Sequence, residues 1–153
     1  MKIILMRHGQ AESYANVDSD SARKLTDSGQ AQALETASYL AEHYQADMLV
    51  VSPYLRAQQT AAQVNRYFNA LSPVTQDNIT PEDDAREALK TLGEHESDCM
   101  IVVCHMSIVA HIAALLTGDY PESFALAEAR VFETEFVMMG MATEIDRFVP
   151  KQP

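Results

Sequence analysis

The chain has 153 residues, of which 47% are hydrophobic, so it is long enough for one domain with a real core and short for two. Its formal net charge of −11 argues against nucleic-acid binding, which needs clustered Lys and Arg. Without a membrane-length apolar run or a secretory signal, we expect one cytoplasmic domain over residues 1–153, with no nucleic-acid or membrane partner.

The first predicted element is a strand, the apolar run Ile3-Ile4-Leu5-Met6, which ends at Arg7-His8-Gly9. In open α/β sheets, ligand sites lie beyond the carboxyl ends of the strands. There, His8 would offer a nitrogen nucleophile and Arg7 a planar cation that matches phosphate oxygens. A structural Arg and His at a strand end remain the alternative, and this motif alone does not decide between them.

A helix over 26–44 follows, with Thr26 as its N-cap, and then a strand at Leu49–Val51. Ser52-Pro53 leads into a second helix, over 54–68, whose apolar positions recur at helical spacing. Arg56 would lie in its first turn, where a positive charge opposes the helix dipole. Such a broken local rule tends to mark a functional site, and a bound anion would remove the conflict.

The middle of the chain predicts a short edge strand that starts at Pro73-Val74 and a polar helix over 82–95. A strand at 100–104 then ends at His105, and a helix capped by Ser107 runs to about Leu116 before Gly118. His105 would therefore lie near a helix N-terminus, which favours an anion.

The two cysteines and the remaining histidines predict neither a disulfide nor a metal site. Cys99 and Cys104 flank one strand on opposite faces, so they are too far apart to bond, and Cys104 is expected to act as a small hydrophobe. His105 and His111 lack the spacing of a helical ligand pair, and neither Cys-x-x-Cys nor His-Glu-x-x-His occurs.

The tail predicts a hairpin of Val131–Val137 and Thr143–Phe148 with a turn near Gly140. The methionines of Met138-Met139-Gly140-Met141 are expected to cover the core, in preference to forming a binding patch. Alternating strands and helices followed by such a tail predict an α/β fold: a three-layer domain with a mainly parallel sheet, an antiparallel edge and helices on both faces.

The ordered set of motifs resembles the histidine phosphatase superfamily, whose fold is phosphoglycerate mutase-like. The motifs run from residue 2 to about 116: Arg7-His8-Gly9, Leu25-Thr26 with Gly29, Ser52-Pro53 with Arg56-Ala57 and Thr60, and His105. The short length and Ile79-Thr80-Pro81 are most similar to the SixA-type protein phosphohistidine phosphatases. The chain departs from the pattern at Met106-Ser107, where relatives often carry proline or glycine.

The resemblance implies a nucleophile, His8, and a phosphate clamp of Arg7, Arg56 and His105, without a metal or cofactor. His8 would attack as a neutral imidazole whose other nitrogen donates its proton to a backbone carbonyl. In the superfamily a carboxylate from the region of Glu82, Asp83 and Asp84 often serves as general acid, and the sequence does not say which of these faces the site.

The favoured function is dephosphorylation of phosphohistidine in a protein, such as a phosphorelay or phosphotransfer component, through a phosphohistidine enzyme intermediate. Two alternatives stand beside it. A small-molecule phosphomonoesterase would need one of the three acids as a proton donor. A non-catalytic phosphate-binding module is disfavoured, because a binding protein has no need of the nucleophile His8. The identity of the phosphoprotein and the oligomeric state are left open by the sequence.

Overall fold

One six-stranded sheet forms the centre of the protein, and its strand order is β3-β2-β4-β1-β5-β6. The computed structural model describes residues 1–68 and 71–153. The strands are β1 (Lys2–Arg7), β2 (Met48–Val51), β3 (Val74–Thr75), β4 (Cys99–Cys104), β5 (Ala129–Glu133) and β6 (Thr143–Phe148). Strands β3, β2, β4 and β1 pair in parallel, and β5 and β6 add an antiparallel edge beside β1. The predicted sheet is therefore confirmed.

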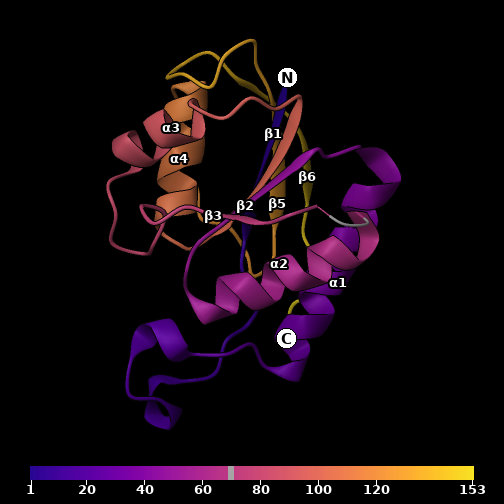
Figure 1. Cartoon of the computed structure of the whole chain (residues 1–153), viewed down its shortest axis with the longest axis vertical. Coiled ribbons are helices and arrows are strands. Elements are labelled where there is room, and N and C mark those ends of the chain that lie inside the picture. The colour runs from indigo at the N-terminus through magenta and orange to yellow at the C-terminus, as the bar shows by residue number, and fades with distance from the viewer. Residues whose placement is uncertain (69–70) are drawn as a thin grey trace.

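Helices cover both faces of the sheet, as predicted (Figure 1). Helices α1 (Asp27–His43) and α2 (Leu55–Phe68) pack on one face, and α3 (Ala85–Leu92) and α4 (Ile108–Thr117) pack on the other. Successive strand residues point to opposite faces. In β4, Cys99 is therefore buried toward α1 and α2 while Cys104 is buried toward α3 and α4, and both are free thiols, as predicted.

The helix boundaries follow local hydrogen bonds. Thr26 caps α1, because its hydroxyl accepts from the backbone N–H of Gly29 at 3.0 Å. Helix α4 ends at Gly118, whose φ of 79° is the left-handed conformation that glycine adopts at helix ends. Ser107 precedes α4, but its side chain makes no capping bond, so that role was wrongly predicted. Its backbone is already helical, whereas a capping residue is normally extended.

Helix α3 spans Ala85–Leu92 and is shorter than the predicted 82–95. The Asp84 carboxylate accepts from the backbone N–H groups of Arg86 and Glu87, so the helix begins after it. The Asp83 carboxylate turns back to the N–H and hydroxyl of Thr80. Side-chain bonds of this kind compete with helix formation, and periodicity does not reveal them.

The tail also differs from its prediction. Strand β5 ends at Glu133 and not at Val137, because the Thr134 hydroxyl donates to the carbonyl of Phe136 and turns the chain. The turn at Gly140 is present, with φ of 74°. The methionines around it do not cover the core: Met138, Met139 and Met141 are 58, 51 and 48% exposed.

The segment between β1 and α1 lies beyond the carboxyl ends of the parallel strands, seen as the indigo-to-purple loop at the bottom of Figure 1. It contains two short 3₁₀ helices, η1 (Tyr14–Asn16) and η2 (Asp20–Ala22). In the part of the chain that the structure describes, no helix combines the length and apolar character needed to cross a membrane.

Candidate active site

Three parallel strands end side by side and bring His8, Ser52 and His105 to one edge of the sheet. Arg7 at the end of β1 is in register with Cys104 of β4, so His8 and His105 follow on neighbouring strands. Their ring centroids lie 5.1 Å apart. The backbone ladder continues past the strand ends, because the N–H of His8 donates to the carbonyl of Cys104 and that of Ser52 to Val103. The sheet therefore fixes the backbone beneath both histidines.

His8 has the protonation pattern of a nucleophile. Its Nδ1 lies 2.7 Å from the backbone carbonyl of Gly9, and only a protonated nitrogen can bond there. Its Nε2 accepts from Nε of Arg56 at 3.2 Å, so this nitrogen carries the lone pair. Burial, followed by the positive charges of Arg56 and Arg7, lowers the pKa of His8 to about 3. The ring is therefore neutral at pH 7, with its lone pair on Nε2.

His105 is fully buried, and its ring is hydrogen-bonded to the hydroxyl of Ser52. Its Nε2 lies 2.7 Å from the Ser52 hydroxyl, which itself accepts from the backbone N–H of Tyr54 at 3.3 Å. When the Ser52 hydroxyl donates to Nε2, the ring proton of His105 lies on Nδ1. Burial, followed by His8 and Arg56, lowers the pKa of His105 to about 2. Nδ1 is buried and has no hydrogen-bond partner among residues 1–68 and 71–153, so in this tautomer its N–H is available to a ligand.

Arg7 contributes a second unsatisfied donor. Its Nη1 donates to the carbonyl of Phe124 at 2.9 Å, whereas its buried Nε has no partner in the part of the chain that the structure describes. Buried polar groups without partners are uncommon and each needs an explanation. Here Arg7 Nε and the Nδ1 of His105 belong to two of the four predicted site residues. Two oxygens of a bound anion would satisfy both donors.

Arg56 lies in the first turn of α2 and is 3% exposed. Besides the bond from Nε to His8, its Nη1 donates to the carbonyl of Asp20 at 2.7 Å, and Nη2 to the Asp20 carboxylate at 3.1 Å. The conflict between this cation and the helix dipole is thus relieved in part by an acid of the protein itself. Sequence reasoning missed Asp20, because a loop without periodicity gives no sign of where its side chains point.

The loop after His8 is held by close packing against the start of α1. The N–H of Gly9 donates to the Thr60 hydroxyl at 3.2 Å. A Cβ atom on Gly9 would lie 2.4 Å from the backbone oxygen of Gly29, and one on Gly29 would lie 2.1 Å from that of Gln10. Only glycine allows this approach. Gly9, Gly29 and Thr60 of the sequence pattern therefore serve to position the carbonyl that orients His8.

The acidic turn lies beside α4. Asp83 and Asp84 line a hollow with His111 of that helix and with Gly118 and Asp119, which follow its C-terminal end. His105 precedes the opposite end of this ten-residue helix, which is about 15 Å long. The carboxylates of Asp83 and Asp84 are also engaged in turn and capping bonds. Both acids are thus bonded within the turn itself.

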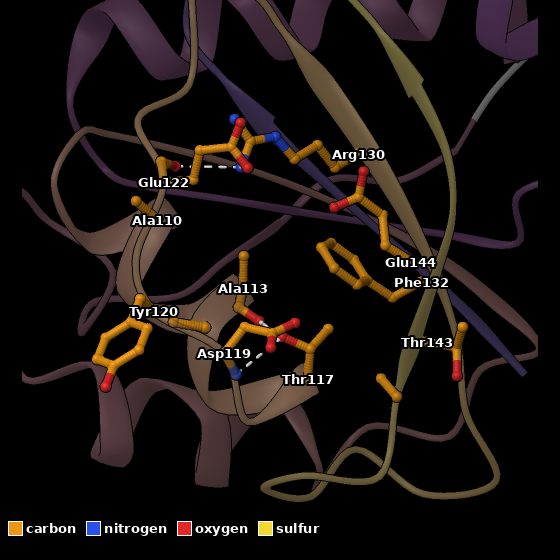
Figure 2. A pocket seen from close by; sticks show the side chains of 12 residues that line it. Ala110, Ala113, Thr117, Asp119, Tyr120, Glu122, Arg130, Phe132, Thr143 and Glu144 are labelled. Atoms are coloured by element: carbon orange, nitrogen blue, oxygen red, sulfur yellow. Dashed lines mark hydrogen bonds and ion pairs between the residues drawn. The ribbon is translucent and has the colours of Figure 1, made fainter.

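A second hollow, of about 430 Å³, lies between α4 and the β5–β6 hairpin and contains none of the four predicted site residues (Figure 2). The buried side chain of Arg130 lies at its edge and donates to the carbonyls of Glu122 and Ser123 and to the carboxylate of Glu128. These bonds fix the segment that carries Phe124, whose carbonyl holds Arg7. Arg130 therefore stabilises the segment whose carbonyl accepts from Arg7.

Metal ligands are not gathered at these positions. Within residues 1–68 and 71–153, no group of three or more His, Cys, Asp or Glu side chains is arranged to hold a metal ion. The positive charge at the histidines comes from Arg7 and Arg56.

Comparison with known proteins gives consistent matches. The sequence model of the histidine phosphatase superfamily (branch 1) matches residues 3–80. The chain is 37% identical over 143 residues to the phosphohistidine phosphatase SixA homolog of Haemophilus influenzae, with 82% of this chain and 86% of that protein covered. It is 30% identical over 130 residues to phosphohistidine phosphatase SixA of Escherichia coli, with 81 and 80% covered.

Solved structures agree with the sequence matches. The structure of the protein histidine phosphatase SixA complexed with tungstate has a TM-score of 0.86 at 27% identity, and the match covers 98% of this chain and 97% of that one. A phosphoserine phosphatase from Entamoeba histolytica has a TM-score of 0.75 at 15% identity over 99 and 98% of the two chains, a likeness of fold alone.

Proposed function

Because this chain belongs to the histidine phosphatase superfamily, we propose that it removes phosphate from phosphohistidine side chains of a protein, with His8 as the covalent nucleophile. The observation that carries this proposal is the arrangement around His8. Its neutral ring presents the Nε2 lone pair, and two buried donors without partners, Arg7 Nε and His105 Nδ1, belong to the same site.

In the first step, His8 Nε2 attacks phosphorus as the bond from phosphorus to the substrate imidazole breaks. The Arg56 Nε–H, which donates to His8 Nε2 in the free protein, then donates to a phosphate oxygen. The donors of Arg7 and His105 bind the remaining phosphate oxygens. The departing imidazole takes its proton from solvent. Water then attacks the phosphorus on His8, releases inorganic phosphate and restores the neutral ring. The two guanidinium groups supply the charge that a metal ion supplies in other phosphoryl-transfer sites, so we propose that no metal is needed.

The leaving group is the reason to favour a phosphohistidine protein over a metabolite ester. An imidazole departs more readily than an alkoxide and depends less on a general acid. Of the three acids that the sequence offered for that role, Glu82, Asp83 and Asp84, the last two are bonded to the backbone of their own turn. The names of the Haemophilus influenzae and Escherichia coli relatives point to the same substrate class. A phosphorelay or phosphotransfer component is the kind of partner that carries such a group.

A side-by-side assay tests the proposal. The protein is incubated with a phosphohistidine-bearing phosphotransfer protein, with p-nitrophenyl phosphate and with a panel of metabolite phosphates. We expect the phosphohistidine protein to give the highest kcat/KM, with and without EDTA. A metabolite ester cleaved far faster would instead identify a small-molecule phosphomonoesterase. Loss of activity in EDTA that a divalent ion restores would show that a metal takes part.

A further inference from the structure

The strongest contact in the site that the proposed chemistry does not use is the one between Asp20 and Arg56. Asp20 lies in η2, in the loop between β1 and α1, and this short helix contacts α2. Both its backbone carbonyl and its carboxylate accept from Arg56, at 2.7 and 3.1 Å. An arginine side chain has several rotatable bonds, and fixing them by two acceptors on one residue leaves the guanidinium a single orientation.

The two acceptors occupy one particular edge of the guanidinium. Asp20 takes Nη1 and Nη2, at the far end of the fork, while Nε donates to His8 Nε2. From this we infer that Asp20 is a positioning residue: it holds the terminal edge of Arg56 so that the Nε edge faces the nucleophile. The inference rests on the proposed function, in which that edge binds the phosphoryl group being transferred.

Asp20 is itself held in place. Arg23 donates from Nη1 to the Asp20 carboxylate at 2.9 Å and from Nε to the carbonyl of Glu12 at 2.8 Å. The Arg23 guanidinium also lies 4.4 Å over the ring of Tyr14. Partial burial raises the pKa of Asp20, but the hydrogen bonds from Arg23 and Arg56 outweigh it and hold the pKa below its ordinary value. At neutral pH the carboxylate is therefore ionised and already aligned before a substrate arrives.

A competing explanation makes the opposite prediction. If the Asp20 carboxylate occupied the place of a phosphate oxygen, it would block the site, and its removal would strengthen the binding of substrate. If Asp20 positions Arg56, its removal weakens the transition-state contact. The donors of Arg7 and His105 favour positioning, because they stay without a partner among the described residues while Asp20 accepts from Nη1 and Nη2 of Arg56.

The kinetic test compares Asp20→Ala with Asp18→Asn, which removes one charge from an exposed position of the same loop. For a phosphohistidine protein, we expect Asp20→Ala to lower kcat roughly tenfold with KM within about twofold, because a contact made only in the transition state is lost. Asp18→Asn should stay within about twofold of the unmodified protein. A rise in kcat/KM for Asp20→Ala would overturn the inference in favour of blocking.

A double-mutant cycle separates positioning from a general loss of structure. In an Arg56→Ala background, Asp20→Ala should lower kcat/KM by no more than about twofold further, because the group that it positions is gone. An equal tenfold loss in both backgrounds would show that Asp20 acts on something other than Arg56. Asp20→Asn keeps one side-chain oxygen that can accept from Arg56, so its kcat should lie between those of Asp20→Ala and the unmodified protein.

A third measurement does not depend on activity. In nitrogen-15 NMR spectra, the Nε–H signal of Arg56, identified by its loss in Arg56→Lys, should be sharp in the unmodified protein and in Asp18→Asn. It should broaden or exchange rapidly in Asp20→Ala. An unchanged signal would refute the positioning role. A signal lost in Asp20→Ala from a protein that cleaves no phosphohistidine would refute the proposed function and uphold the contact.

Discussion

The ring of His8 is neutral, and its Nδ1 proton is hydrogen-bonded to the carbonyl of Gly9, which leaves Nε2 as the proposed nucleophile. Replacement of His8 therefore tests the covalent step directly. His8→Ala should abolish turnover and leave the fold intact. After mixing with substrate that carries a labelled phosphate, the unmodified protein should hold a covalent phosphate that is labile in acid and stable in base. The His8→Ala variant should hold none. His111→Ala, a change at an exposed histidine of α4, is the matched control and should label normally. Full turnover by His8→Ala would end the covalent hypothesis.

Arg56 presents a planar fork that lysine cannot reproduce. Arg56→Lys should lower kcat/KM by on the order of 10²–10³, the scale for the loss of one preorganised donor, although the positive charge is kept. Arg7→Ala and His105→Ala should cause losses of similar size. Arg66→Lys, near the C-terminal end of the same helix, makes the same substitution outside the site and should have no effect. Rescue of activity by lysine at position 56 would show that charge alone is needed.

The two buried histidines should make the protein sensitive to acid. Their pKa values in the folded state, about 3 for His8 and about 2 for His105, lie below the ordinary value of about 6.5. As the pH falls below 6.5, the unfolded chain therefore takes up protons that the folded one excludes, and folding stability is lost. Each histidine contributes up to about 1.4 kcal/mol per pH unit to this slope.

Urea denaturation at pH 7, 5.5 and 4 measures that slope. The free energy of unfolding should fall toward acid, and more gently in His105→Gln than in the unmodified protein. His111→Gln should leave the slope unchanged. A free energy of unfolding that stayed level from pH 7 to pH 4 would contradict the assignment of both rings as buried and neutral.

At the scale of elements, a change at the N-cap of α3 should lower the stability of the fold without lowering catalytic activity. Asp84 caps this helix, so Asp84→Ala should lower the free energy of unfolding by about 0.5–2 kcal/mol. The same change should leave dephosphorylation of a phosphohistidine protein within roughly threefold, because the helix lies away from His8. Glu82→Gln removes a neighbouring charge without the cap and should alter neither quantity. A large loss of phosphatase activity in either variant would restore the acidic turn as a proton donor.

The elements that the sequence predicted well are those whose burial decides their structure. Ile3–Met6 and the run to Cys104 are apolar at every position, a pattern that fits strands buried on both faces. The boundaries that went wrong depend on hydrogen bonds of single side chains, as at Asp84 and Thr134. Similarly, the strand-end residues His8 and His105 could be predicted, but Asp20 reaches Arg56 through a loop whose path only the fold determines.

At the scale of the whole molecule, the net charge of −11 should influence substrate choice. A negative surface repels small anions over long range, and salt screens that repulsion. Turnover of p-nitrophenyl phosphate should therefore be weak and should rise modestly as sodium chloride is raised from about 20 to about 300 mM, where the Debye length is much shorter. Turnover that fell over this range would mean that the site attracts anions strongly enough to outweigh the surface.

The place of β1 in the strand order also bears on how the polypeptide is made. Although β1 leaves the ribosome before the other strands of the sheet, it lies in the interior of the sheet and pairs with β4 and β5. At about 5–20 residues per second, the backbone edge of β1 that pairs with β5 waits on the order of ten seconds for residues 129–133 to be synthesised. Helices α1 and α2 are complete long before then. The nascent chain therefore exposes an unpaired hydrophobic strand, a target for chaperones, until its last third has emerged.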